Sequence, residues 1–447
     1  MSRQISASLG IFRLGPGVSR ANAATLLFGA LCTLCLVTFI NFAQPYLFVT
    51  IGIPASEQGS LSGQLVGVQE MIQVLIAGTV GALSDRHGRR IIYVIGLAWM
   101  AAGLVIYPLA ESTLGLMAFR AFYSVGVTTA SVMMVTCFAE YTAETTRGRW
   151  MGLIGVFNGL GVVLMAIVLA KIPLWLGQRG FDDEAAIHYS FWIFAAGALV
   201  LAGILWRGLQ PRQEQPGRPK LTLLKQSGIG LAAARENPRI GLAYLLAFAS
   251  RGDLVIITTF LSLWIIQAGV QAGLSPGAAT ARAGMVFGLA QAVALVWSFG
   301  MGWILDRISR LSGVCLAFAL AAAGYLSLGQ VADPLGGWVL PAAILVGIGE
   351  ASVMVAAGVL IGQEAPKASR GTVIGSFGLC GSLGIMSLTF AGGFVYDHIN
   401  AQAPFVMMGL VNVVVLLAAL RVRHRYPQPA PVADARTTPK EVLLDAD

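Results

Sequence analysis

Residues 81–89 read GALSDRHGR and residues 302–310 read GWILDRISR, so a charged motif occurs twice in this chain. The same shift of 221 positions carries ASVMMV at 130–135 onto ASVMVA at 351–356. A shift of 223 positions carries Arg147-Gly148 onto Arg370-Gly371. Three matches in one order, with nearly one offset, indicate that the chain contains two homologous halves.

Long apolar runs fill both halves. Of the 447 residues, 56% are hydrophobic and only 11% are charged, and the mean hydropathy is +0.76. Twelve runs are long enough to cross the hydrocarbon core of a bilayer as helices, and they lack the alternation of a membrane β-barrel. They lie at residues 24–48, 60–84, 91–110, 114–138, 150–171, 188–206, 241–268, 280–304, 312–331, 337–362, 371–395 and 403–420. We therefore expect an all-α integral membrane protein with six transmembrane helices in each half.

The positive charges lie between alternate runs. Of 29 Lys and Arg residues, 24 lie in the two tails and in the connections that follow the even-numbered runs. Because cationic loops stay in the cytoplasm, we expect both termini there, in a multi-pass protein of a cell membrane of the bacterial inner-membrane type. This distribution argues against a nucleic-acid partner, although the net charge is +8. The expected units are the halves 1–206 and 241–425, a cytoplasmic linker at 207–240 and a disordered tail at 426–447.

Two six-span halves joined by a basic linker are typical of secondary transporters, whose site lies near the bilayer midplane between the repeats. With the charged motif after the second span and its copy after the eighth, residues 20–425 resemble the major facilitator superfamily. The resemblance implies a monomeric transporter that carries a small-molecule substrate across the lipid bilayer by alternating access. It also implies that spans one, four, seven and ten line the cavity, that two, five, eight and eleven flank it, and that the others face lipid.

In this superfamily the motif after span two latches the cytoplasmic side. The resemblance implies that Asp85 accepts hydrogen bonds from the N-terminus of span eleven, near Gly371, where a helix presents free N–H groups. Arg89 is then expected to pair with Glu140, while the glycines allow a tight turn. The residues of this first latch are Gly81, Asp85, Arg86, Gly88, Arg89 and Glu140. The alternative is that the arginines only anchor the topology.

The repeated motif predicts a second latch at the mirror position. Asp306 is expected near Gly148 at the start of span five, and Arg310 beside Glu364. Ser309 replaces the glycine of the first copy, so we expect this latch to be looser. Its residues are Asp306, Arg307, Arg310 and Glu364. Together the two latches are expected to close the cytoplasmic side and hold the protein open outward.

Charged residues deep in the spans mark the candidate transport site. A charge at the bilayer centre costs at least about 2.5–3.5 kcal/mol, so it is expected to face a cavity or a partner. Spans three, six, nine and twelve contain no Asp, Glu, Lys or Arg. Five deep charges lie in the others: Glu70, Arg120, Arg251, Asp253 and Glu350. Asn41 and Gln44 on the first span are candidate polar contacts for a substrate.

The seventh span carries Arg251 and Asp253 two residues apart, so in a regular helix their side chains point about 200° from each other. Each therefore needs its own partner, unless Gly252 loosens the helix. We expect Arg251 to face Glu350 across the cavity; the alternative is a permanently buried structural salt bridge. A carboxyl group that alternates between such a partner and a low-dielectric site can take up and release a proton. Glu350 is the first candidate for this role and Asp253 the next, while Glu70 either shares it or bonds to a neighbouring helix.

Arg120 lies in LMAFRAFYSVG at 116–126, which resembles the R-x-x-x-G-x-G motif of the proton-coupled exporters of the superfamily. Ser124 takes the place of the first glycine, and Gly126 is the second. The fifth span has the glycines of the drug/proton antiporter signature but lacks its Gly-Pro pair. This departure leaves the direction of transport open and weakens an assignment to drug efflux.

Three functions are compatible with the sequence. The first is a proton-coupled secondary transporter of a small organic solute, and the second is an uncoupled facilitator or importer of the same fold. The third is a non-transporting membrane sensor or assembly factor. The chain lacks the G-x-x-x-x-G-K-[ST] motif and a catalytic constellation, so neither an ATP-driven pump nor an enzyme is expected. We expect no cofactor and no metal, because the four histidines are not clustered and Cys32 and Cys35 lie within an apolar helix.

Overall fold

A computed structural model of the protein describes residues 8–9, 12–15, 17–142, 146–211, 223–366 and 369–426. Nearly all of these residues are helical, and they include twelve helical segments that are long and apolar enough to cross a membrane. The all-α membrane fold and the twelve spans that the sequence predicts are thereby confirmed.

Each half contains six spans, some of them built from more than one helical segment. The N-terminal half consists of α1 (Arg20–Thr50), α2 (Gln58–His87), α3 (Arg89–Ile106) with η1 (Tyr107–Leu109), α4 (Thr113–Glu140), α5 (Arg147–Ile167) with η3 (Leu169–Lys171) and α6 (Ile172–Gln178), and α7 (Asp183–Gly208). The C-terminal half consists of α9 (Pro238–Ile256) with the π-helix η4 (Ile257–Leu261) and α10 (Ser262–Gln271), α11 (Pro276–Arg307), α12 (Arg310–Leu328), α13 (Val339–Glu364), α14 (Arg370–His398) and α15 (Ala403–Arg425).

Polar caps mark where several spans begin. The side chains of Ser112, Asp182 and Ser275 each accept a hydrogen bond from a backbone N–H three residues later, in α4, α7 and α11. These bonds satisfy N–H groups that have no partner within the helix. At the end of α2, Gly88 has φ +91°, a conformation that other residues rarely adopt, and the chain turns directly into α3.

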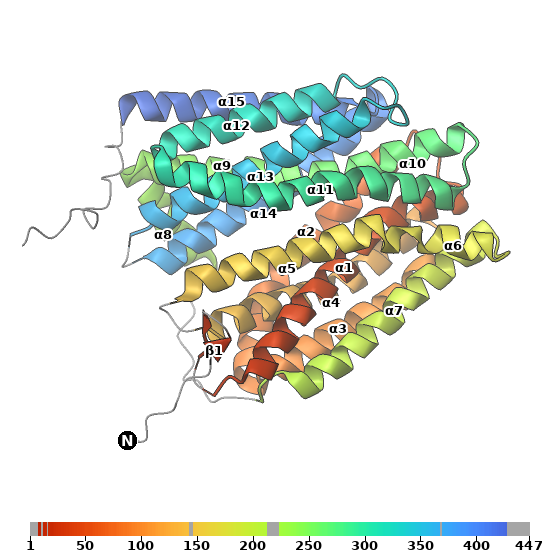
Figure 1. Cartoon of the computed structure of the whole chain (residues 1–447), viewed down its shortest axis with the longest axis horizontal. Helices are drawn as coiled ribbons and strands as arrows, with labels where there is room; N and C mark the ends of the chain where they lie inside the picture. The colour runs from red at the N-terminus through yellow and green to blue at the C-terminus, as the bar shows by residue number, and fades with distance from the viewer. Residues whose placement is uncertain are drawn as a thin grey trace, which may run out of the picture.

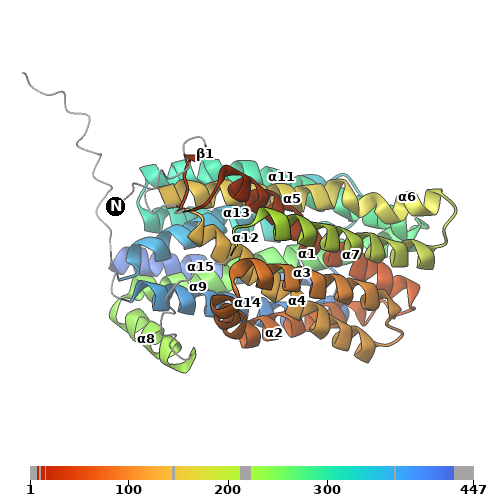
Figure 2. The same cartoon turned by 90° about the horizontal axis from the view of Figure 1, so that it is seen from below.

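The two halves lie side by side, the N-terminal half coloured red to yellow-green and the C-terminal half green to blue (Figure 1). Across their interface α2 packs against α14, and α5 packs against α11. We call the membrane face at which α1 begins and α15 ends the tail face, and the other the opposite face. The helix α8 (Leu223–Glu236) lies outside the bundle at the tail face, where it contacts α14 and α9 (Figure 2).

The contact between α2 and α14 is tight near the opposite face and open toward the tail face. A Cβ on Gly63 would lie 2.3 Å from the carbonyl oxygen of Thr389, and one on Gly67 would lie 2.5 Å from the ring of Phe390. Gly78 follows Gly67 by about three helical turns and lies on the same side of α2. A Cβ on Gly78 would nevertheless meet nothing within 4 Å.

The second contact between the halves follows the same pattern. In α11, a Cβ on Gly284 would lie 2.2 Å from the carbonyl oxygen of Ala166 at the end of α5. Gly302 lies five helical turns further along the same side of α11, and Gly152 lies near the start of α5. A Cβ on either of them would meet nothing within 4 Å. The halves therefore touch at the opposite face and diverge toward the tail face.

Two segments predicted only as basic connections contain regular structure. Before α1, the strands β1 (Ser8–Leu9) and β2 (Phe12–Arg13) form an antiparallel hairpin. The ring of Phe12 lies 5.7 Å from that of Trp150 in α5, so the hairpin packs on the tail face of the N-terminal half. The linker predicted at 207–240 contains α8, and of the tail predicted at 426–447 all but residue 426 lies outside the described residues.

Candidate functional site

A cavity of about 340 Å³ lies between the halves, at α2, α9 and α14. Its α14 wall carries Gly375, Gly378, Ser382 and Ile385, whose spacing of three and four residues places them on one side of the helix. The small side chains on this wall leave the space open, and the volume suits a small molecule. The full lining is Gln73, Val74, Ala77, Gly78, Arg251, Gly375, Gly378, Leu379, Ser382 and Ile385.

Arg251 supplies the charge that lines this cavity. Its side chain lines the cavity, and the carboxylate that acts on it electrostatically is that of Glu70 of α2, in the other half. Glu70 is only 6% exposed, lies beside Ser382 and has one carboxylate oxygen without a hydrogen-bond partner. Among the described residues, no ion pair within 4 Å joins Arg251 to a carboxylate. Arg251 therefore lies within electrostatic reach of an acid without a direct ion pair to it.

The predicted pairing of Arg251 with Glu350 is wrong for this conformation. Glu350, on α13, is 5% exposed and accepts a hydrogen bond from Nε2 of Gln291 at 2.9 Å. Gln291 lies on α11, in the same half, so this bond joins two helices of the C-terminal bundle. The pair does not form because the side of α9 that carries Arg251 faces the cavity lined by α2 and α14 rather than α13.

Asp253 points away from Arg251, as the spacing of two residues predicts. Its carboxylate is completely buried and accepts a hydrogen bond from Nδ2 of Asn412 in α15 at 2.7 Å. The Tyr325 hydroxyl of α12 donates to the backbone carbonyl of Asp253. Asp253, a candidate for proton coupling, thus has its own partner inside the C-terminal half and does not line the cavity at α2, α9 and α14.

The seventh span is irregular, but not at Gly252. The helix α9 continues through that glycine, and a Cβ there would lie 2.2 Å from Cδ1 of Leu388 in α14, so the glycine allows close packing. The interruption is the π-helix at Ile257–Leu261, five residues later. Such segments occur frequently at functional sites of helical proteins.

Arg120 and Gln44 meet inside the N-terminal half rather than at the cavity. Arg120 is 2% exposed, and its Nη1 donates to Oε1 of Gln44 at 3.3 Å. The Tyr107 hydroxyl donates to the same oxygen at 3.2 Å, and the guanidinium lies 5.8 Å from the ring centroid of Tyr123. Asn41 is partly buried and forms no side-chain hydrogen bond with the residues that the structure describes. These contacts join α1 to α4 and η1.

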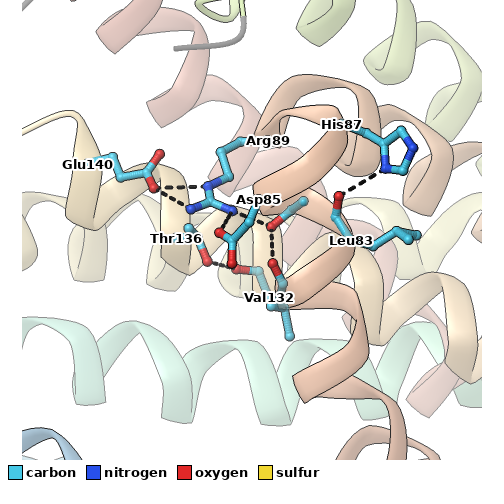
Figure 3. Close-up of polar contacts among 9 residues, drawn as sticks. Leu83, Asp85, His87, Arg89, Val132, Thr136 and Glu140 are labelled. Carbon is cyan, nitrogen blue, oxygen red and sulfur yellow. Dashed lines mark hydrogen bonds and ion pairs between the residues drawn. The ribbon is translucent and has the colours of Figure 1, made fainter. Parts of the chain in front are cut away.

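The first motif forms a charged cluster at the tail face (Figure 3). Nε and Nη2 of Arg89 both contact Oε1 of Glu140 at 2.9 Å, so the predicted pair is present. Arg89 also forms an ion pair with Asp85, four residues earlier. This cluster joins the α2–α3 turn to the end of α4, within one half. Arg86 is exposed at the same turn, and the role of the motif as a latch between the halves stays a prediction.

The second copy of the motif differs from the expectation. The side chain of Asp306 is 79% exposed, and Arg310 lies 3.6 Å from it. The predicted pair of Arg310 with Glu364 is wrong. Glu364 instead accepts from Arg239 at 3.4 Å and from Asn237 at 2.9 Å, since α13 ends beside the start of α9. Arg307 lies over the Trp303 ring, 3.5 Å from its centroid.

Ser382 is a cavity residue for which sequence reasoning assigned no role. Ser382 follows Gly378 by four residues and Gly375 by seven, so the sequence alone places one polar and two small residues on one side of α14. This spacing could have identified Ser382 as a candidate site residue. The spans that form this cavity wall are the second, seventh and eleventh, of which the resemblance predicted only the seventh. Within the described ranges, no group of three or more His, Cys, Asp or Glu residues is placed to hold a metal ion.

Twelve spans in two halves, with a charged cavity at the interface between them, define a membrane transporter. Residues 26–388 match the Major Facilitator Superfamily, and a second match covers residues 301–444. The chain belongs to this superfamily.

Similar proteins include two magnetosome proteins. The chain is 28% identical to Magnetosome protein MamH of Paramagnetospirillum magneticum over 91% of this chain and 93% of that protein. It is 29% identical to Magnetosome protein MamZ of Magnetospirillum gryphiswaldense over 84% of this chain, and the match spans 58% of MamZ. The crystal structure of the nucleoside transporter NupG matches with a TM-score of 0.69 at 14% identity, over 90% of this chain and 99% of that chain. The last likeness shows the fold, which is that of a multi-pass membrane transporter.

Proposed function

We propose that this protein is a proton-coupled secondary transporter of a small organic anion that works by alternating access. The observation that carries the proposal is the charged side chain of Arg251, which lines the cavity between the halves. A charge in the membrane interior is costly, so its placement at a solute-sized cavity favours a role in binding. An arginine binds carboxylate and phosphate groups through two parallel hydrogen bonds.

Glu70 supplies the proposed link to protons. Arg251 can attract either the Glu70 carboxylate or the anionic group of a solute. A proton on Glu70 removes the competing negative charge and leaves the guanidinium to the solute. Proton and anion then bind in a mutually favourable way, and this coupling joins their movements across the membrane. Glu350 and Asp253, which the sequence placed first, are bonded inside the C-terminal half and are not part of this mechanism.

The tail face is proposed to be the cytoplasmic face, because most of the Lys and Arg residues lie there. The divergence of the halves toward that face then makes the described conformation open to the cytoplasm, the reverse of the outward-open state that the two latches were expected to hold. Arg235, on α8, and Gly337, before α13, are both exposed and lie at opposite faces of the membrane. Each is replaced by a single cysteine in a separate variant. We expect a membrane-impermeant thiol reagent added to intact cells to label only the cysteine at 337. Labelling of both from outside would contradict this orientation.

Binding is tested by thermal unfolding of the purified protein with lactate, succinate and glycerol 3-phosphate, and with the uncharged lactamide and glycerol. We expect at least one anion to raise the melting temperature by mass action, and Arg251→Ala to abolish that rise. Arg282→Ala is the matched control, because Arg282 donates to the Leu335 carbonyl and does not line the cavity. A rise that persists in Arg251→Ala, or no rise with any of the three anions, would contradict the proposed substrate class.

Coupling is tested in liposomes with the stabilising anion and an internal pH dye. We expect Glu70→Gln to lose accumulation of the anion driven by a pH gradient while it retains exchange at equal pH. Glu350→Gln is the control and is expected to keep both activities. If Glu70→Gln still concentrates the anion, the coupling role does not belong to Glu70. If the wild-type protein carries the anion without protons, it is a facilitator.

A further inference from the structure

An acid of the C-terminal half closes the first turn of a helix in the N-terminal half. Asp397 lies at the end of α14, at the opposite face, and is half-buried. Its Oδ1 accepts from the backbone N–H of Gly59 at 2.9 Å, and its Oδ2 accepts from the backbone N–H of Ser60 at 2.6 Å. Both oxygens of one carboxylate are therefore bound to the start of α2.

The start of α2 depends on this contact. The first four N–H groups of a helix have no partner within the helix and carry a partial positive charge. Glu57, at the N-cap position of α2, forms no capping bond with its side chain. Asp397 takes over the function of a cap from the other half of the molecule, through two charge-assisted hydrogen bonds.

The backbones of the two helices approach so closely that the carboxylate can reach this turn. A Cβ on Gly59 would lie 2.5 Å from Oδ1 of Asp397, and one on Gly393 would lie 2.5 Å from the carbonyl oxygen of Gly59. Any side chain at either position would therefore displace the cap. The glycines at these positions make the contact specific to a closely packed opposite face.

Two glutamines extend the same contact. Nε2 of Gln267, at the end of the seventh span, donates to Oε1 of Gln58 at 2.9 Å, and the Tyr396 hydroxyl donates to Oε1 of Gln267 at 2.7 Å. A hydrogen-bonded chain thus runs from α14 through α10 to the first residue of α2, beside Asp397. The halves are joined here by polar groups that water can replace.

We propose that Asp397 is the gating residue of the opposite face, and that its carboxylate caps α2 only while that face is closed. Opening the face separates α14 from the start of α2 and transfers two N–H groups and one carboxylate to water. Because water satisfies these groups, the contact holds the closed state without making it permanent. Asp397 and Asp85 then occupy corresponding positions at the two faces. Asp397 lies at the end of α14, where α2 begins, and Asp85 lies near the end of α2, where α14 begins. This gate does not depend on the identity of the substrate or on proton coupling.

The gate is tested with spin labels in place of Ser56 and Ile399, which are exposed at the opposite face in different halves. Pulsed EPR of the protein in liposomes then measures the separation of the halves, with no substrate required. We expect Asp397→Asn to raise the ratio of long to short distances about tenfold, because it removes the charge that the helix N-terminus favours. Glu57→Gln is the matched control, since it removes an exposed acid beside the same turn and no capping bond; it is expected to leave the distances unchanged.

A second pair of variants tests the contact from the other half. Ser60→Pro deletes one of the two N–H donors in the first turn of α2, where no hydrogen bond within the helix is lost, and is expected to widen the opposite face as Asp397→Asn does. Ser60→Ala keeps the N–H and removes only the long bond of 3.4 Å from the Ser60 hydroxyl to the Gly393 carbonyl, so it is expected to stay close to the wild type. Unchanged distances in Asp397→Asn and Ser60→Pro would overturn the proposal, as would an equal shift in the Glu57→Gln and Ser60→Ala controls.

Discussion

Gly63 provides a direct measure of how tightly the opposite face is closed. A Cβ at this position would lie 2.3 Å from the carbonyl oxygen of Thr389, whereas 3.4–4 Å is an ordinary contact. Gly63→Ala therefore requires α2 and α14 to separate locally by about 1 Å, because the atom it meets belongs to the backbone. Overpacking of this kind typically costs about 1–3 kcal/mol. The closed opposite face should lose population by a factor of about 5 to 150 relative to an open one.

Gly203→Ala in α7 is the matched control, because a Cβ there would meet nothing within 4 Å and α7 packs against α1 and α3 of its own half. Both substitutions replace a helical glycine by alanine, and both raise helix propensity by about 1 kcal/mol. That gain is the same in every conformation of a folded helix, so it cancels in the ratio of open to closed states. The difference between the two variants then reports the contact with α14 alone.

The spin-label pair at 56 and 399 measures the outcome. Gly63→Ala is expected to shift the distances toward the separated state, and Gly203→Ala to leave them as in the wild type. The same variant should increase labelling, from outside the cell, of a cysteine in place of Ser382 in the cavity. If Gly63→Ala leaves both readouts unchanged, the close approach of α2 and α14 does not control access at this face.

Two further predictions concern contacts within each half. Removing either partner of the Arg89–Glu140 pair should lower the melting temperature. Because the pair is partly exposed, a double-mutant cycle should give a coupling energy of about 0.5–1 kcal/mol. Additive losses of stability in the two single variants would refute a direct interaction. Asn412→Leu should cost about 1–3 kcal/mol, because it leaves a buried carboxylate oxygen of Asp253 without its donor. Replacing Asp253 and Asn412 together by Leu should recover much of that loss, and a double variant as unstable as Asn412→Leu alone would show that the bond is not the cause.

The positions of the spans could be read from the sequence because crossing a bilayer depends on local properties. A segment of about 20 apolar residues must form its backbone hydrogen bonds within itself, so length and hydropathy are sufficient to identify it. The run predicted at 24–48 corresponds to α1 at Arg20–Thr50, and the run at 371–395 corresponds to α14 at Arg370–His398. The duplicated halves and the membership of the superfamily follow equally from short motifs, each of which is a run of neighbouring residues.

Which charges meet was decided by the packing of helices against one another. Helical geometry alone requires Arg251 and Asp253 to diverge, and they do, but it does not say which helix each one meets. Arg251 lies within electrostatic reach of Glu70 and Asp253 bonds to Asn412, since α9 packs against α14 on one side, at the cavity that α2 also lines, and against α15 on another. The bond of Asp397 to the start of α2 spans 338 residues of sequence, and neither partner carries a local signal for the other. The sequence thus determines what lies in the membrane, and the tertiary structure decides which buried polar groups become partners, because that depends on the approach of segments far apart in the chain.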